Sequence, residues 1–295
     1  MRQGYLAGFL RLSGAAVVFN LTLFFSLYTQ ANPLTDKIAE VERKLDARVG
    51  VSVYNPTSQQ LWHYKGNLRF PLMSTFKTLA CAKLLADVDS GKQSIEQTAL
   101  IKQEALITWS PVTEQHVGER FTLKQACTAA MLMSDNTAAN IVLEGIDGPA
   151  ALTRFLRVIG DEVTRLDRIE PYLNEAKPDD LRDTTTPNAM ANSLAELLFG
   201  NTLSQTAKDQ LKQWMMENKV SDSLLRSELP TGWLIADRSG AGGFGSRGIT
   251  AVVWPAEKPP LVIAIYLTQT DASFDSRNQA IAEIGKTIFE HYPDK

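Results

Sequence analysis

The strand signals of this chain lie at its two ends with a long helical stretch between them, and this order restricts the fold more than any other feature. The β-branched run at 49–54 and the segment 61–64 flank a turn that contains Asn55 and Pro56, which is the pattern of a hairpin. Three further strand-like segments lie near the C-terminus, at 233–236, 249–254 and 261–267. Strands from both ends bury their apolar faces most economically in one shared layer, so we expect a single antiparallel five-stranded sheet.

Helical patterns account for most of the remaining chain. Apolar residues recur every three or four positions from Leu34 to Leu45 and again from about 275 to 291, as in amphipathic helices. The stretch from 74 to 216 is also mostly helical in pattern. The predicted fold class is therefore α/β of the α+β type, with the sheet covered by the terminal helices. We expect an α/β part at about 32–73 and 220–295, an all-helical part at about 74–219, and a site where the two meet.

The N-terminus has the pattern of an export signal. Arg2 and Arg11 are the only charged residues before Asp36, and residues 12–28 are mostly apolar. A basic start, an apolar middle and a small residue at Ala31 are typical of a secretory signal peptide. We therefore expect residues 1–31 to be cleaved and the domain at 32–295 to reside in the periplasm. The alternative is a retained membrane anchor, but the run is shorter than the roughly 20 apolar residues of a span.

Export changes how the two cysteines are interpreted. Cys81 and Cys127 are the only cysteines in the chain, and in an oxidising compartment they can form a disulfide. The alternative is a pair of buried free thiols that behave as small apolar side chains. The three histidines are scattered at 63, 116 and 291, so we expect no metal site.

Composition and charge exclude several classes of protein. The 295 residues are 44% apolar and 21% charged with a net charge of −3, which is typical of a globular protein. No basic excess indicates nucleic-acid binding. The run from Gly240 to Gly245 matches G-x-G-x-x-G, but a strand pattern at 249–254 follows it. A dinucleotide site needs a helix there to hold the pyrophosphate, so a nicotinamide oxidoreductase is disfavoured and we expect a glycine-rich hairpin turn.

Two short motifs place reactive side chains in the middle of the chain. Ser74 and Lys77 form the only S-x-x-K, and this spacing at a helix start brings a hydroxyl beside an amine that can activate it. Ser134-Asp135-Asn136 offers a second hydroxyl for proton transfer and an amide for binding. Either motif could instead only cap a helix, with Lys77 solvated.

Two further segments carry groups suited to the same chemistry. Arg168 and Asp183 bracket a segment of the size of an Ω-loop and could clasp its ends. Within it, Glu170 and Asn174 could hold a water molecule between a carboxylate and an amide. Arg238-Ser239-Gly240 supplies a cation, a hydroxyl and a glycine that lets the backbone approach a ligand. The plain alternatives are loop surface and a turn.

Taken together, S-x-x-K, S-D-N, E-x-x-x-N and R-S-G in this order, with a cysteine pair, resemble the class A serine β-lactamases. Arg-Ser-Gly in place of Lys-Thr-Gly is most similar to the carbenicillin-hydrolysing (CARB) subgroup. The resemblance covers essentially the whole chain after residue 31. It implies the fold shared by serine β-lactamases and penicillin-binding transpeptidases, and hydrolysis of penicillins, carboxypenicillins included, which gives antibiotic resistance.

The resemblance also implies a role for each motif residue. Ser74 would attack the β-lactam carbonyl, and Lys77 or Glu170 would take its proton; the sequence leaves these two open. Glu170 and Asn174 would hold the water that hydrolyses the acyl-enzyme. Ser134 would return a proton to the lactam nitrogen. The implied substrate-binding residues are Asn136, Trp109, Arg238, Ser239, Gly240, Ala241 and Arg247, with the N–H groups of Ser74 and Ala241 as oxyanion hole.

The expected partner is a small β-lactam, bound by a monomer without a cofactor, nucleic acid or, after signal cleavage, a membrane. The main alternative is a penicillin-binding D,D-peptidase or β-lactam sensor, which acylates without efficient deacylation. Glu170 and Asn174 favour the hydrolase. An exported interaction protein with a decayed site is disfavoured because every reactive position is intact.

Overall fold

The computed structural model describes residues 1, 4, 8 and 32–291. The predicted signal peptide and its cleavage site near Ala31 lie outside the described residues, apart from Met1, Gly4 and Gly8. Within the described part of the chain, no helix has the length and apolar character needed to cross a membrane.

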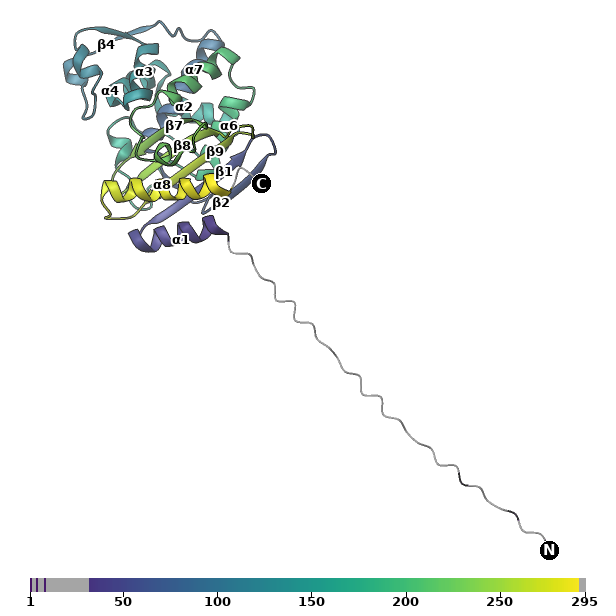
Figure 1. Ribbon diagram of the computed structural model, residues 1–295. Coiled ribbons are helices and arrows are strands. Elements are labelled where there is room, and N and C mark those ends of the chain that lie inside the picture. The colour runs from purple at the N-terminus through teal and green to yellow at the C-terminus, as the bar shows by residue number, and fades with distance from the viewer. Residues whose placement is uncertain (2–3, 5–7, 9–31, 292–295) are drawn as a thin grey trace. The chain divides into compact units, whose positions relative to one another are not determined.

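A five-stranded antiparallel sheet forms the centre of the structure, as predicted (Figure 1). Its strands in spatial order are β2 (Gln60–Tyr64), β1 (Arg48–Asn55), β9 (Leu261–Thr268), β8 (Arg247–Trp254) and β7 (Leu234–Ala241). The N-terminal hairpin joins the C-terminal strands through β1 and β9, where Val51 lies opposite Ile265. The two ends of the chain therefore close one sheet around the inserted helical region.

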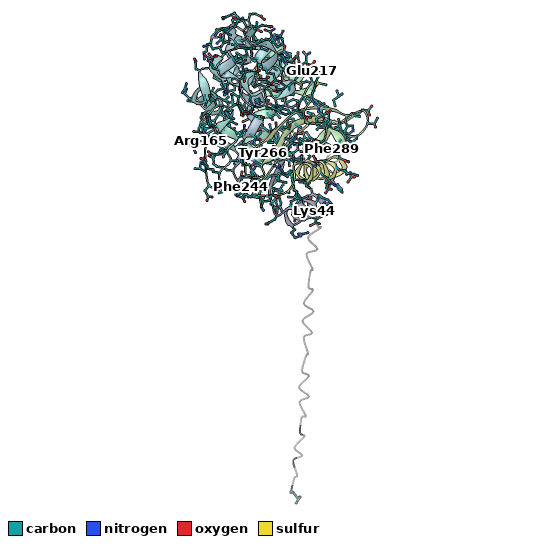
Figure 2. All side chains as sticks on the ribbon, turned by 90° about the vertical axis from the view of Figure 1, so that its left-hand side faces the viewer. Lys44, Arg165, Glu217, Phe244, Tyr266 and Phe289 are labelled. Atoms are coloured by element: carbon teal, nitrogen blue, oxygen red, sulfur yellow. A yellow bond between two sulfur atoms is a disulfide. The ribbon has the colours of Figure 1, made fainter. Side chains whose placement is uncertain are left out.

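Alternation along the strands gives the sheet two apolar faces, and helices cover both. One face, with Val51, Ile249 and Ile265, packs against α1 (Pro33–Leu45) and α8 (Phe274–His291). The other face, with Ala264 and Tyr266, packs against the inserted helices. Tyr266 is fully buried, and Figure 2 labels it together with Phe289 of α8.

The inserted region is mostly helical, but the expectation of an all-helical part at about 74–219 is wrong, because three short strands also lie in it. Its helices are α2 (Phe76–Asp89), α3 (Leu123–Met133), α4 (Asn136–Gly145), α5 (Gly148–Val158), α6 (Pro187–Phe199) and α7 (Gln205–Met216), with 3-10 turns η1 (Met73–Thr75), η2 (Gln103–Ala105), η3 (Thr113–His116), η4 (Tyr172–Asn174) and η5 (Leu225–Glu228). Two small sheets pair β3 (Phe70–Pro71) with β6 (Thr184–Thr185) and β4 (Thr98–Leu100) with β5 (Arg120–Thr122).

The glycine-rich run after Ser239 differs from expectation at its start. The hairpin turn was expected from Gly240 onward, but β7 continues through Ala241, which pairs with Arg247 of β8. Gly240 pairs with Gly248 in the same ladder. The turn therefore begins at Gly242, because the neighbouring strand supplies partners that the local sequence does not reveal.

Candidate active site

Ser74 lies in the 3-10 turn η1 that precedes α2, and its side chain is buried. The turn is pressed against β7: a Cβ built on Gly240 would lie 2.8 Å from the Ser74 nitrogen. Only glycine permits this approach. The N-cap positions of η1 and α2 are Leu72 and Thr75, so the plain N-cap interpretation does not describe Ser74.

Lys77 is one helical turn further on, and its amine connects three of the four motifs. Its Nζ donates to the Ser134 carbonyl oxygen at 2.8 Å and to Asn136 Oδ1 at 2.7 Å. It lies 3.3 Å from Ser134 Oγ and 3.4 Å from Glu170 Oε1. Ser134 Oγ in turn lies 3.2 Å from Ser74 Oγ. Across residues 32–291, the hydrogen-bonded connection from Lys77 to Ser74 runs through Ser134.

The environment of Lys77 favours loss of its proton. Complete burial lowers the pKa of Lys77 to about 8, although the negative charge of Glu170 opposes this shift. The positive charge of Arg238 lowers the same pKa further. A neutral amine is therefore accessible near neutral pH, as a proton acceptor requires.

Ser134 and Asp135 of the S-D-N segment have different surroundings. Ser134 ends α3 with a left-handed backbone at φ +60°, which turns its hydroxyl toward Ser74. Asp135 is fully buried, caps α4 through Ala138 N, and accepts from the backbone N–H and hydroxyl of Thr113. The capping role that the sequence allowed for the whole motif therefore falls to Asp135.

The structure joins the two ends of the predicted Ω-loop. Arg168 Nε lies 2.6 Å from Asp183 Oδ2, and Asp183 Oδ1 accepts from the N–H groups of Asp167 and Arg168 at 2.7 and 2.9 Å. Asp183 is buried, and Arg168 also pairs with Glu175. These bonds hold the segment that carries Glu170.

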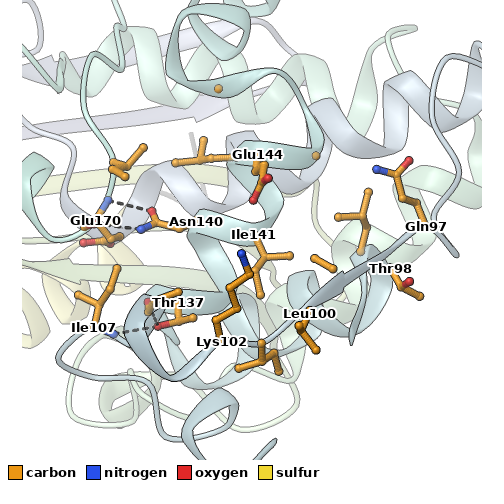
Figure 3. A pocket seen from close by; sticks show the side chains of 18 of the residues that line it. Gln97, Thr98, Leu100, Lys102, Ile107, Thr137, Asn140, Ile141, Glu144 and Glu170 are labelled. Atoms are coloured by element: carbon orange, nitrogen blue, oxygen red, sulfur yellow. Dashed lines mark hydrogen bonds between the residues drawn. The ribbon is translucent and has the colours of Figure 1, made fainter. Parts of the chain in front are cut away.

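Glu170 is held by its backbone as well as by its side chain. Asn140 of α4 donates to the Glu170 carbonyl oxygen and accepts from the Glu170 N–H, both at 3.0 Å (Figure 3). Asn174 Nδ2 donates to Glu170 Oε2 at 2.5 Å. Two buried acceptors, Glu170 Oε1 and Asn174 Oδ1, accept no hydrogen bond from the described residues, although Glu170 Oε1 also lies in an ion pair with Lys77 Nζ at 3.4 Å. A crevice of about 720 Å³ borders Glu170 and Asn140 from the side of β4.

Two buried arginines lie on β7 and β8. Arg238 is fully buried, and burial lowers its pKa to about 10, so it remains a cation at neutral pH. Arg247 donates to Asn278 Oδ1 at 2.7 Å and to the Gly240 carbonyl oxygen at 2.9 Å, and burial lowers its pKa to about 10 as well. Ser239 donates to the Val220 carbonyl oxygen at 3.3 Å. Ala241 ends the strand beside them.

Trp109 lies next to the S-D-N segment. Its side chain is 59% exposed, its indole N–H donates to the Met133 carbonyl oxygen at 3.0 Å, and its own carbonyl accepts from Asn136 N. The Asn136 side chain bridges Lys77 and the Thr108 carbonyl oxygen. Trp109 and Asn136 are therefore neighbours in the structure, next to Lys77.

The predicted disulfide is confirmed. Cys81 of α2 and Cys127 of α3 are joined by an S–S bond with a Cα–Cα distance of 5.8 Å. The bond links the helix that carries Lys77 to the helix that ends at Ser134.

Two asparagines of the site were not predicted from the sequence. Asn140 follows Asn136 by four residues on α4, and this spacing places both on one helix face, so a signal was present. Asn218 contacts Arg238 from a loop 20 positions earlier in the chain, and no spacing rule reveals that contact.

Comparisons with known proteins agree with this geometry. A family model described as the β-lactamase enzyme family matches residues 33–292. The chain is 57% identical to β-lactamase CARB-4 of Pseudomonas aeruginosa over 85% of this chain and 88% of that protein. The crystal structure of the chromosome-encoded β-lactamase of Vibrio parahaemolyticus matches with a TM-score of 0.86 and 55% identity, covering 89% of this chain and all of that one. An ancestral class A β-lactamase (GNCA) matches with a TM-score of 0.86 and 47% identity, covering 88% of this chain and all of that one.

The match extends over nearly all of the described residues and includes the sheet, the helical insertion and the site between them. A serine hydroxyl close to a buried lysine is an arrangement suited to acyl transfer. The chain therefore belongs to the β-lactamase enzyme family and is a class A serine β-lactamase, a hydrolase that opens the amide bond of β-lactam antibiotics and so gives resistance to them.

Proposed function

We propose that Ser74 is the nucleophile of this β-lactamase and that its proton leaves through Ser134 and Lys77. The observation that carries the proposal is the continuous contact from Ser74 Oγ to Ser134 Oγ at 3.2 Å and on to Lys77 Nζ at 3.3 Å. As the Ser74 oxygen bonds to the lactam carbon, its proton passes toward the neutral amine. When the carbon–nitrogen bond breaks, Ser134 returns a proton to the lactam nitrogen. Glu170, 3.4 Å from Lys77, is the next group on the same path.

The negative charge that develops on the lactam carbonyl oxygen needs hydrogen-bond donors to stabilise it. The N–H groups of Ser74 and Ala241 are proposed to supply them, because Gly240 brings the end of β7 against η1. Losing one such donor typically costs about 2.7–4 kcal/mol of barrier.

Deacylation is assigned to Glu170 and Asn174. Glu170 Oε1 and Asn174 Oδ1 are buried acceptors that accept no hydrogen bond from the described residues, and one water molecule can donate to both. The Glu170 carboxylate then removes a proton from that water as its oxygen attacks the ester carbon. The ester bond to Ser74 breaks, and the proton returns to the Ser74 oxygen.

Substrate binding is assigned to the cations of β7 and β8. Arg238, Ser239 and Arg247 would bind the carboxylate on the fused ring, while Asn136 and Trp109 would contact the acylamino side chain. A guanidinium does not release its proton at working pH, so Arg238 acts by charge and hydrogen bonding alone. The Arg-Ser-Gly sequence and the similarity to CARB-4 support penicillins, including carboxypenicillins, as substrates.

We further propose that the enzyme is exported to the periplasm as a monomer after cleavage near Ala31. The pattern of Arg2, Arg11 and the apolar run supports this. N-terminal sequencing of the periplasmic fraction tests the cleavage site.

The central experiment compares the wild-type enzyme with Glu170→Ala. Both are mixed with carbenicillin and with a chromogenic cephalosporin, and turnover and protein mass are recorded. The wild type is expected to turn over both substrates, and Glu170→Ala to accumulate a covalent adduct of the mass of the substrate. Asp179→Asn is the matched control, since it removes an exposed carboxylate of the same loop that pairs with neither Lys77, Asn174 nor Arg168.

Two outcomes would contradict the proposal. Normal turnover by Glu170→Ala would remove Glu170 from deacylation. A stable adduct on the wild type without turnover would instead favour a penicillin-binding D,D-peptidase or a β-lactam sensor.

A further inference from the structure

Arg238 is a buried cation whose hydrogen-bond partners among the described residues are all neutral. Its Nε lies 3.3 Å from the Ser74 carbonyl oxygen, and its Nη1 lies 3.4 Å from both the Met131 carbonyl oxygen and Asn218 Oδ1. Its Nη2 is buried without a partner in this part of the chain. No carboxylate of the described residues comes within ion-pair distance of it. All three contacts are long, so the guanidinium keeps most of its capacity to bind an anion.

The carboxylate of Asp237 is next to Arg238 in the chain, but it pairs with other groups. Asp237, the preceding residue of β7, is fully buried and pairs with Arg226 Nε at 2.7 Å. It also accepts from Ser221 Oγ and from Asn218 Nδ2, both at 2.5 Å. The carboxylate of Asp237 therefore makes its ion pair and its hydrogen bonds with groups other than Arg238, although its negative charge still raises the pKa of Arg238.

Asn218 stands between these two charges. Its Nδ2 donates to Asp237 and to Ser221 Oγ, while its Oδ1 accepts from Val220 N at 3.2 Å and faces Arg238 Nη1. The orientation of the amide is fixed, because a carboxylate needs a donor and a guanidinium needs an acceptor. Asn218 is 3% exposed.

We propose that Asn218 is a positioning residue that sets specificity for anionic substrates: it separates Asp237 from Arg238 and leaves the charge of Arg238 unpaired until substrate binds. This inference rests on the proposed role of Arg238 in binding the substrate carboxylate. An amide gives Arg238 a dipole to hold its position without cancelling its charge. A carboxylate at position 218 would form an internal ion pair, and the substrate would have to displace it.

The sharpest test exchanges the two side chains in the double variant Asn218→Asp/Asp237→Asn. This exchange keeps the number of carboxylates, amides and heavy atoms, and moves one negative charge from the Arg226 side to the Arg238 side. The substrates are benzylpenicillin and its methyl ester, which lacks the anionic group. The readout is the ratio of kcat/KM for the acid to kcat/KM for the ester.

We expect the exchange to lower this ratio about tenfold, through a higher KM for the acid, because the carboxylate introduced at position 218 competes with the substrate carboxylate for Arg238. Asn188→Asp is the control, because Asn188 is a buried amide on α6 outside the site. That control should keep the wild-type ratio. The single variant Asn218→Asp, which retains Asp237 beside Arg226, tests the same point if the double variant does not fold.

The outcomes separate the inference from the function on which it rests. If wild-type enzyme does not prefer the acid over the ester, the proposed role of Arg238 fails, and the inference with it. If the wild type prefers the acid and the variants keep that preference, the inference alone is overturned. An equal loss of activity on acid and ester would show that Asn218 acts only in folding, which also overturns it.

Discussion

Replacing Asn140 with alanine should slow deacylation more than acylation. Asn140 has no hydrogen bond to Ser74 or Lys77. Among the described residues, its amide binds only the backbone of Glu170, through one donated and one accepted hydrogen bond of 3.0 Å each. Glu170 is therefore positioned partly by a side chain on α4. Without that side chain, the peptide groups of Glu170 lose both partners, and the carboxylate can move away from Asn174.

The size of the effect follows from these two bonds. A typical protein hydrogen bond contributes about 0.5–1.5 kcal/mol net, so the pair contributes about 1–3 kcal/mol to holding Glu170 in place. If this loss appears fully in the barrier for deacylation, the rate falls about 5- to 150-fold. Acylation keeps the contacts among Ser74, Ser134 and Lys77, so its rate should change much less.

Rapid mixing with benzylpenicillin, acid quench and mass measurement report the fraction of enzyme held as acyl-enzyme. We expect Asn140→Ala to accumulate the adduct in the steady state and the wild type to show little of it. Asn192→Ala on the exposed face of α6 is the control for loss of an asparagine. Equal slowing of acylation and deacylation, or no accumulation with an unchanged rate, would refute the reasoning.

Three further predictions concern binding, stability and protonation. Arg238→Ala should raise KM mainly for carboxylate-bearing substrates while Arg238→Lys retains activity; equal steady-state constants for Arg238→Ala and wild type would contradict the electrostatic role. Replacing Cys81 and Cys127 together by alanine should lower the free energy of unfolding in urea by about 4 kcal/mol, because the disulfide closes a loop with a sequence separation of 46. Burial lowers the pKa of Lys77 to about 8, and the negative charge of Glu170 opposes this shift. Glu170→Gln removes that charge, so the pKa of Lys77 should fall further, which an NMR titration of 13C-labelled lysine measures. An unchanged or higher titration midpoint would contradict this prediction.

The sheet could be predicted because its signals are local. The strand segments from both ends carry β-branched and apolar runs bounded by turn residues. Each run predicts a strand from its own residues, without knowledge of the strands that pair with it. The extent of β7 could not be predicted in the same way. Gly240 and Ala241 favour a turn in isolation, yet they form ladder pairs with Gly248 and Arg247, because tertiary pairing outweighs a weak local preference.

The residues of the site could be predicted, but not the order in which they touch. The S-x-x-K spacing indicates that Lys77 lies beside Ser74, whereas the structure connects them through Ser134. That connection depends on the left-handed backbone of Ser134 at φ +60° and on the 3-10 turn that carries Ser74. Neither feature follows from residue type, because serine rarely adopts this backbone unless its surroundings impose it.

The ion-pair partners of Arg238 could not be predicted from its motif alone. The sequence places a cation after Asp237, and adjacent opposite charges suggest mutual neutralisation. In the structure the two side chains have separate partners: Asp237 pairs with Arg226, and Arg238 faces neutral oxygens. A buried cation without a counter-ion is costly unless a ligand supplies the opposite charge. The contacts of Arg238 therefore agree with the proposed binding of an anionic substrate, and Asn218, which contacts both Asp237 and Arg238, is the residue proposed to keep the two charges apart.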